Sequence, residues 1–233
     1  MSGSWGTLGV LTEVALKVLP VSETQVTLKV HVNTWADAVG CMSAALGTPF
    51  DVSGAATVQA AEGGFDSLIR IEGFETSVQY RASELTQRLA KFGTVDVVGD
   101  PWAEVKDLRA WAALDTVWRI SVRPTDSLKV IELMQGLQQD RGFHCQLDWG
   151  GGLLWLGLEA AQMADTRAGL ALHQALQRHV AQLRGHATLV TSGLLRDQEL
   201  CHFQPLERAI ERVSQSLREK FDPRGILNPG RMR

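Results

Sequence analysis

The sequence predicts an α+β protein built on one antiparallel sheet with helices on one side. Two observations predict this fold class. Apolar residues alternate over short segments, as in half-buried strands, and recur at helical spacing over longer segments. The resulting order of elements is βαββαβ, and the same order then appears a second time. Each set of six elements corresponds to a ferredoxin-like unit, so we expect a duplicated ferredoxin-like sheet.

The first predicted unit spans residues 22–99. It begins with a strand over 22–33, in which four aliphatic residues alternate onto one face. A helix follows, and Thr34 is placed to cap its N-terminus. Two short strands joined by a glycine-containing loop, an amphipathic helix and a closing strand complete the unit. The elements after the first strand are predicted at 35–46, 52–60, 67–72, 76–92 and 94–98.

The second predicted unit spans residues 115–191 and repeats this order. Its two middle strands are turned by three successive glycines at 150–152. The repetition is one of element order and not of matching residues. A helix over 101–114, with Pro101 in its first turn, links the two units. The elements of the second unit are predicted at 116–122, 127–139, 143–149, 153–159, 161–183 and 186–191.

The two ends of the chain lie outside these units. At the start, glycines recur at every third position and lead into a predicted strand over 10–19, which Pro20 ends. At the other end, a predicted helix over 206–221 has an apolar stripe and stops at Asp222 and Pro223. The last ten residues have turn chemistry only.

Composition excludes several functional classes. The chain has 233 residues, a net charge of −3 and no basic run, so nothing in it indicates a nucleic-acid partner. No apolar run approaches the ~20 residues of a membrane span, and no signal-peptide pattern is visible. The three cysteines are widely spaced and suggest buried thiols, and no histidine spacing suggests a metal site. We expect a cytoplasmic protein whose membrane association, if any, is made through partners.

Both ends and several internal stretches resemble one family. The segment Gly3-Ser-Trp-Gly-Thr-Leu-Gly-Val-Leu-Thr-Glu13 resembles the closing segment of the FAD-binding domain in FAD-linked oxidases of the vanillyl-alcohol oxidase type. The segment Phe221-Asp-Pro-Arg-Gly-Ile-Leu-Asn-Pro-Gly-Arg-Met232 is similar to the C-terminal signature of that family. Residues 116–122, 148–152 and 185–189 are similar to FAD-binding E subunits of bacterial glycolate oxidases. The likeness covers nearly the whole chain.

The resemblance implies a domain organisation. The family's flavin domain begins with a glycine-rich loop that cradles the pyrophosphate, and this chain has no such loop. We therefore interpret the chain as a C-terminal portion. Residues 1–21 would be the last strand of the FAD-binding domain, residues 22–203 a cap domain, and residues 204–233 a helix and tail that return to the flavin. The chain alone is then expected to be inactive and unable to hold FAD.

The resemblance also implies which residues contact FAD. Asn228 is the best single candidate, because an amide both donates and accepts hydrogen bonds and so suits the edge of a flavin ring. The other candidates act mostly through their backbone: Gly3, Ser4, Gly6, Thr7, Gly9 and Val10. The alternative is structural, since Asn-Pro-Gly is also a plain turn and a glycine-rich stretch also serves as a tight connection.

Two residues are candidates for chemistry on a substrate. His186, at the start of a predicted strand, could act as a base or stabilise an anionic flavin. Arg119 could pair with a carboxylate through two hydrogen bonds, as a small 2-hydroxy-acid substrate would require. The alternatives are a satisfied histidine at a sheet edge and a solvated arginine on a strand.

Two functions from different classes fit these residues. In the first, the chain is part of an FAD-binding subunit of a glycolate oxidase complex, which oxidises a 2-hydroxy acid to a 2-oxo acid. Hydride would pass to the flavin and electrons to an iron–sulfur subunit, with the FAD-binding D subunit as a further partner. In the second, the sheet is a non-catalytic surface for assembly or electron relay in that complex.

Overall fold

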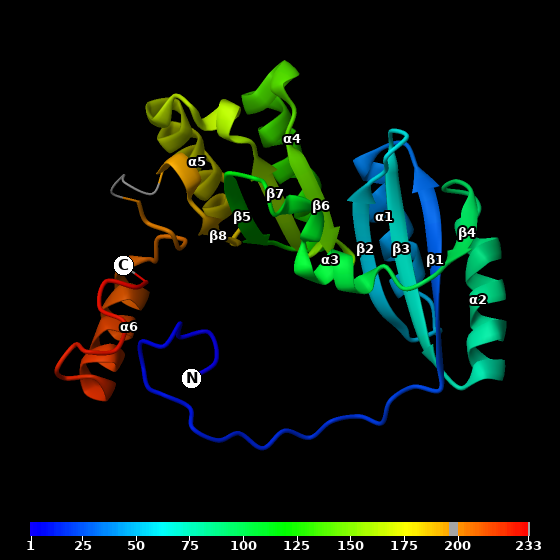
Figure 1. Ribbon diagram of the computed structural model, residues 1–233, viewed down its shortest axis with the longest axis horizontal. Helices are drawn as coiled ribbons and strands as arrows, with labels where there is room; N and C mark the ends of the chain where they lie inside the picture. The colour runs from blue at the N-terminus through cyan, green and yellow to red at the C-terminus, as the bar shows by residue number, and fades with distance from the viewer. Residues whose placement is uncertain (196–199, 233) are drawn as a thin grey trace.

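The computed structural model describes residues 1–195 and 200–232. These residues form one antiparallel sheet with the strand order β4-β1-β3-β2-β6-β7-β5-β8 (Figure 1). The predicted α+β class with an antiparallel sheet is therefore confirmed. Strands β1 to β8 are Thr24–Val32, Val52–Gln59, Phe65–Gly73, Val95–Val98, Thr116–Ser121, His144–Asp148, Leu153–Leu158 and His186–Thr191.

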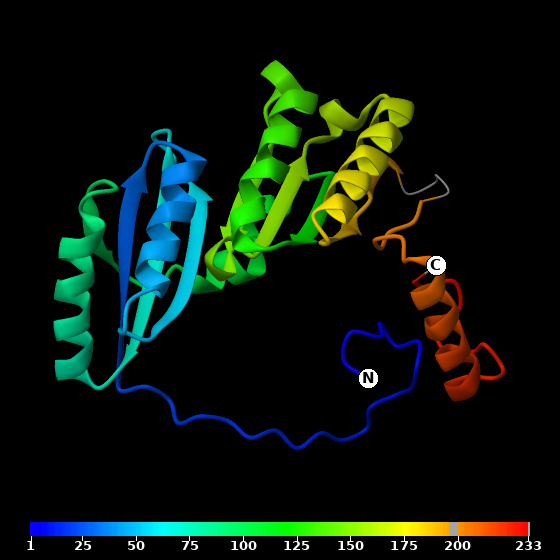
Figure 2. The ribbon, with the colours of Figure 1, turned by 180° about the vertical axis from the view of Figure 1, so that it is seen from behind.

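Helices cover one face of the sheet and leave most of the other face open. In Figure 2, α1, α4 and α5 lie in front of the strands, and the short α3 lies on the opposite side. The apolar side chains of α1, α2, α4 and α5 share one core with the facing strand residues. Helices α1 to α6 are Trp35–Leu46, Glu75–Leu89, Trp102–Asp107, Ser127–Gln138, Thr166–Gln182 and Arg208–Phe221.

The element order βαββαβ occurs twice in the structure, as the sequence predicts. Helix α1 has the predicted bounds, because Thr34 caps it: the Thr34 hydroxyl accepts a hydrogen bond of 3.0 Å from the Asp37 backbone N–H. The two sets of strands meet where β2 pairs with β6 at Thr57 and Leu147.

Two predicted helices are interrupted. The linking helix over 101–114 ends at Asp107 because Leu108 is left-handed, with φ of 50°, and only a short 3-10 turn follows. The helix over 161–183 is divided into a 3-10 turn at Ala160–Met163 and α5. The Asp165 carboxylate causes this division, since it accepts hydrogen bonds from the backbone N–H groups of Arg167 and Ala168 and starts a new helix.

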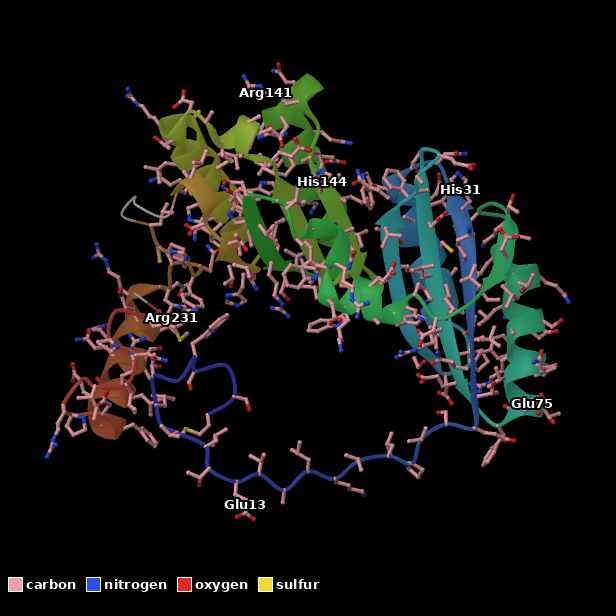
Figure 3. All side chains as sticks on the ribbon, viewed as in Figure 1. Glu13, His31, Glu75, Arg141, His144 and Arg231 are labelled. Carbon is pink, nitrogen blue, oxygen red and sulfur yellow. The ribbon has the colours of Figure 1, made fainter. Side chains whose placement is uncertain are left out.

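The predicted strand over residues 10–19 is wrong for this chain. The segment is extended but pairs with no strand among the described residues, and it runs apart from the sheet (Figure 1). Figure 3 shows Glu13 projecting from it, away from the sheet. Its large apolar side chains are exposed as well, from 58% at Leu11 to 86% at Leu19. A strand needs a neighbour for its backbone hydrogen bonds, and residue alternation alone cannot supply one.

Two cysteines lie in the core, in keeping with the expectation of buried thiols. Cys41 of α1 and Cys145 of β6 are both buried. Burial raises the pKa of the Cys41 thiol to about 12, so this thiol stays protonated at neutral pH. Among the described residues, no helix is both long and apolar enough to cross a membrane.

The second half of the sheet provides a stability prediction. Leu154 of β7 is fully buried between β5 and β6. Leu154→Ala is expected to lower the free energy of unfolding by about 2–5 kcal/mol, because it removes buried methyl groups and leaves a cavity. Urea unfolding followed by circular dichroism measures this loss. The control is Leu137→Ala, at a side chain that is 43% exposed, and an equal loss there would contradict the prediction.

Candidate functional site

The two ends of the chain meet. The Asn228 side-chain amide donates a hydrogen bond of 2.8 Å to the Trp5 carbonyl oxygen, across 223 residues of sequence. In Figure 1 the N-terminal loop and the C-terminal tail lie near one another, apart from the sheet. The two segments that the sequence analysis singled out for cofactor binding are therefore in contact.

Glycine is required at one point of this contact. Gly6 has φ of +75°, and a Cβ added there would lie 2.6 Å from the Asn228 Nδ2 atom. The Gly6 backbone and the Asn228 side chain are too close together to leave room for a Cβ, so a larger residue at position 6 would displace the Asn228 amide. Gly3 also has a positive φ, of +82°, but nothing lies within 4 Å of a Cβ added there.

A hollow of about 920 Å³ opens beside this contact. It lies between the start of β8, the segment after residue 200, α6 and the C-terminal tail. Of the predicted site residues, the structure brings Thr7, His186 and Asn228 to its wall. The wall comprises Thr7, His186, Thr188, Cys201, Phe203, Gln204, Pro205, Leu206, Glu211, Ser214, Gln215, Arg218, Glu219, Asp222, Gly225 and Leu227–Met232.

The N-terminal loop is held by its own hydrogen bonds. The buried Thr7 hydroxyl donates to the Ser4 carbonyl oxygen at 2.7 Å, and the Thr7 backbone N–H donates to the same oxygen at 2.9 Å. The Thr7 hydroxyl oxygen therefore keeps its lone pairs available as an acceptor in the hollow. Ser4, Gly9 and Val10 do not line the hollow: Gly9 packs against the Met1 side chain, and the Val10 side chain is exposed.

Asp222 shapes the tail that presents Asn228. The Asp222 carboxylate accepts a hydrogen bond of 2.6 Å from the Leu227 backbone N–H. This bond, with weaker contributions from the N–H groups of residues 224–226, holds the pKa of Asp222 below its ordinary value of 3.8. Asn228 itself is left-handed, with φ of 44°, a conformation that asparagine tolerates better than most residues.

The lowered pKa of Asp222 gives a pH prediction. A depressed carboxyl pKa contributes stability that is present above the ordinary value and is lost as pH falls through the folded-state pKa. The tail should therefore open below about pH 4, as a fall in amide protection of Leu227, and Asp222→Asn should weaken this protection already at neutral pH. NMR titration and hydrogen exchange measure both effects. Glu219→Gln on the neighbouring helix is the control. An Asp222 carboxyl that titrates at or above 3.8 would contradict the prediction.

The two candidate catalytic residues share the open face of the sheet. In the pairing of β5 with β8, Arg119 lies opposite Thr188 and Ser121 lies opposite His186. His186 and Arg119 are therefore diagonal neighbours on one face. His186 is exposed at the rim of the hollow, but Arg119 does not reach it. The Arg119 guanidinium lies over the rings of Trp149 and Trp155, at 5.4 and 5.9 Å from their centroids.

Sequence reasoning missed the aromatic contacts that hold the N-terminal loop. Trp5 packs edge-on against Phe203, with ring centroids 5.3 Å apart. The Arg231 guanidinium lies 5.3 Å from the centroid of the Trp5 ring, and Figure 3 shows Arg231 beside the loop. Residues 201–205 have no helical or strand periodicity, so no sequence pattern could have placed Phe203 in the site.

Comparison with known proteins identifies a relative. No protein-family model matches the chain. Glycolate oxidase subunit GlcE of Escherichia coli (strain K12) is 31% identical over 236 residues, which include 100% of this chain. The chain is similar to GlcE along its whole length, and it spans 55% of the length of that relative.

Solved structures share the fold of this chain at low sequence identity. An alkyldihydroxyacetonephosphate synthase is 15% identical, with a TM-score of 0.62 over 97% of this chain and 48% of that chain. The 4-ethylphenol oxidase from Gulosibacter chungangensis, in an isoeugenol complex, is 13% identical, with a TM-score of 0.63 over 92% of this chain and 54% of that chain. The chain thus has the fold found in about half of each of these longer chains.

Proposed function

We propose that this chain forms one wall of the flavin site in an FAD-linked oxidase subunit of the glycolate oxidase type. The contact between Asn228 and Trp5 carries the proposal, because it joins the two segments whose sequences resemble flavin-contacting segments. The relationship to GlcE and the fold shared with a 4-ethylphenol oxidase support it. In this proposal, residues 1–21 belong to the flavin domain, residues 22–203 form the cap and residues 204–233 return to the cofactor.

The residues around the hollow fit a flavin. One N–H of the Asn228 amide is used by Trp5, which leaves a second N–H and the side-chain carbonyl oxygen for a ring edge with both donors and acceptors. The Thr7 hydroxyl oxygen adds an acceptor at the wall of the hollow. The hollow of about 920 Å³ is within the usual range for cofactor and ligand sites.

The residues of this chain would bind and orient a small 2-hydroxy acid in this site. FAD, when bound, supplies the hydride acceptor. His186 at the rim of the hollow would act as the general base that accepts a proton from the substrate. Arg119 lies outside the hollow but on the same face of the sheet as His186, and it would pair with the carboxylate of a substrate that extends over this face. We propose an iron–sulfur subunit as the partner that receives the electrons, and the D subunit as a further partner.

We also infer that the cap arose from two ferredoxin-like units. The first half has the strand order β4-β1-β3-β2, and the second half, β6-β7-β5-β8, has the same order when read from its other end. The halves meet through β2 and β6, which are the second strand of each unit. This mirrored arrangement is what an approximate two-fold axis between two copies of one unit would produce, and it supports the duplication.

The second candidate function is assembly or electron relay without chemistry on a substrate. One observation favours it. Helix α6 has no buried residue, and the apolar stripe along it is exposed. An uncovered apolar stripe of this kind is typical of a contact surface for another domain or subunit. The exposed stripe comprises Ile210, Val213, Leu217 and Phe221.

Anaerobic reduction distinguishes the two functions. The experiment joins this chain to a flavin-binding half, loads the protein with FAD and adds glycolate without the D subunit. Bleaching of the visible flavin band is expected, whereas acetate, which lacks the hydroxyl group, should cause none. His186→Gln is expected to slow the bleaching at least about 100-fold, the usual contribution of a general base. Bleaching that requires the D subunit would overturn the catalytic proposal in favour of the relay.

A further inference from the structure

A short segment connects the core of the sheet to the candidate site. Residues 201–204, here named the edge strap, run along the outer edge of β8. The Leu189 backbone N–H donates to the His202 carbonyl oxygen at 2.7 Å, and the Ala187 backbone N–H donates to the Gln204 side chain at 3.2 Å. The strap thus satisfies backbone groups of β8 that would otherwise be exposed at a sheet edge.

Helix α5 holds the same strap from the other side. The Gln177 side-chain amide donates to the carbonyl oxygens of Cys201 and Phe203 at 2.9 and 3.0 Å. The Gln204 side-chain amide donates back to the Gln177 carbonyl oxygen at 3.0 Å. His173, one turn earlier on α5, places its Nε2 atom 3.1 Å from the Cys201 carbonyl oxygen. Both α5 side chains are buried, so these bonds are shielded from water.

The hydrogen bonds of His173 fix its tautomer. The Trp118 indole nitrogen lies 3.0 Å from the His173 Nδ1 atom. An indole N–H can only donate, so Nδ1 must accept and carry no proton. The proton of the neutral ring is then on Nε2, where it donates to the Cys201 carbonyl oxygen. Burial lowers the pKa of His173, which favours this neutral form. Trp118 is fully buried, so the core holds its indole N–H in place beside the His173 ring.

We propose that His173 is a positioning residue for the flavin site. In its Nε2–H tautomer it ties the edge strap to Trp118, and the strap carries Phe203 against Trp5. Trp5 in turn accepts the hydrogen bond from Asn228. The contacts form one path from the core of the sheet to the proposed flavin wall. The flavin part of this inference rests on the proposed function; the tautomer and the strap do not.

The first test uses the 233-residue chain without flavin. Nitrogen-15 NMR of the histidine rings should show His173 protonated at Nε2 and not at Nδ1. His173→Leu should shift the signals of the Asn228 side-chain amide and of the Trp5 and Gly6 backbone amides. His173→Gln guards against the case in which the leucine variant is poorly folded. Its side chain retains a donor for the Cys201 carbonyl oxygen, so the three signals should stay at their wild-type positions. His179→Gln, on the same helix, is the matched control and should leave them unchanged.

The second test uses the flavin-loaded complex with its flavin-binding half. His173→Leu should weaken FAD binding about tenfold, the effect of losing roughly one hydrogen bond, and His173→Gln should recover most of it. A proton on Nδ1, or unmoved Asn228 signals in His173→Leu, overturns the inference. Moved signals with unchanged FAD affinity overturn the positioning role and leave the flavin wall intact. If the wild-type complex binds no FAD, the proposed function fails, and the first test still decides the inference.

Discussion

FAD added to the purified 233-residue chain is expected to separate from it on gel filtration and to leave a colourless protein. The sequence contains no glycine-rich loop for the pyrophosphate of FAD. Such a loop supplies a row of backbone N–H donors to a dianion, which is a large share of the affinity for a dinucleotide. Without it, we expect a dissociation constant on the order of 1 mM or weaker.

The same gel-filtration measurement can be made on this chain together with a flavin-binding half. Co-expression with a flavin-binding half should give a stable complex, because the exposed α6 stripe and the unpaired segment over 10–21 would then be covered. This complex should retain FAD and be yellow. Asn228→Ala in this complex removes the amide and should lower the flavin retained. A flavin band that stays with the isolated chain would mean that these residues suffice for binding. The interpretation of the chain as one wall of a site would then be wrong.

Gly6→Ala is expected to disrupt the contact between the N-terminal loop and the Asn228 side chain. The alanine would have to keep φ near +75° and would place its Cβ 2.6 Å from the Asn228 Nδ2 atom. A left-handed non-glycine residue alone costs about 1–3 kcal/mol, and the clash adds to this cost. The contact between the two ends should break, and FAD binding by the assembled complex should fall by about 10- to 100-fold.

Gly3→Ala is the matched control for this prediction. Gly3 has a similar φ of +82°, but nothing lies within 4 Å of an added Cβ. It therefore carries the backbone strain without the clash. A much larger loss of FAD binding for Gly6→Ala than for Gly3→Ala assigns the difference to the contact with Asn228. Equal losses would show that only backbone strain matters and would contradict the proposed role of the contact.

The sequence predicts elements best where the signal is local. Helix α1 has the predicted bounds because Thr34 caps it within one turn, and β8 has the predicted bounds over residues 186–191. Asp165 is a strong capping residue, but the apolar pattern on both sides of it favoured one continuous helix over 161–183. In the structure a new helix begins after Asp165, because the Asp165 side chain accepts hydrogen bonds from backbone N–H groups at the start of α5. The apolar pattern carries no information about these N–H groups.

Features that depend on distant partners could not be predicted from the sequence. The strand over 10–19 has the right alternation but no partner strand among the described residues, so the prediction failed. The contact between Phe203 and Trp5 joins segments without periodicity. For the site, the resemblance selected Thr7 and Asn228, and the structure brings both to the hollow. The roles of His186 and Arg119 stay predictions, because geometry places them on one face without showing chemistry.

The contact between Asn228 and Trp5 also bears on how this chain folds. Closing a loop of 223 residues costs about 5 kcal/mol of chain entropy, and one hydrogen bond does not offset that cost. The sheet must therefore form first and bring the ends near each other. During synthesis, residues 222–232 leave the ribosome after strands β1 to β8 have been made. The site would be the final part of the protein to assemble, and slow assembly there would leave the exposed segment over 10–21 open to chaperones and proteases.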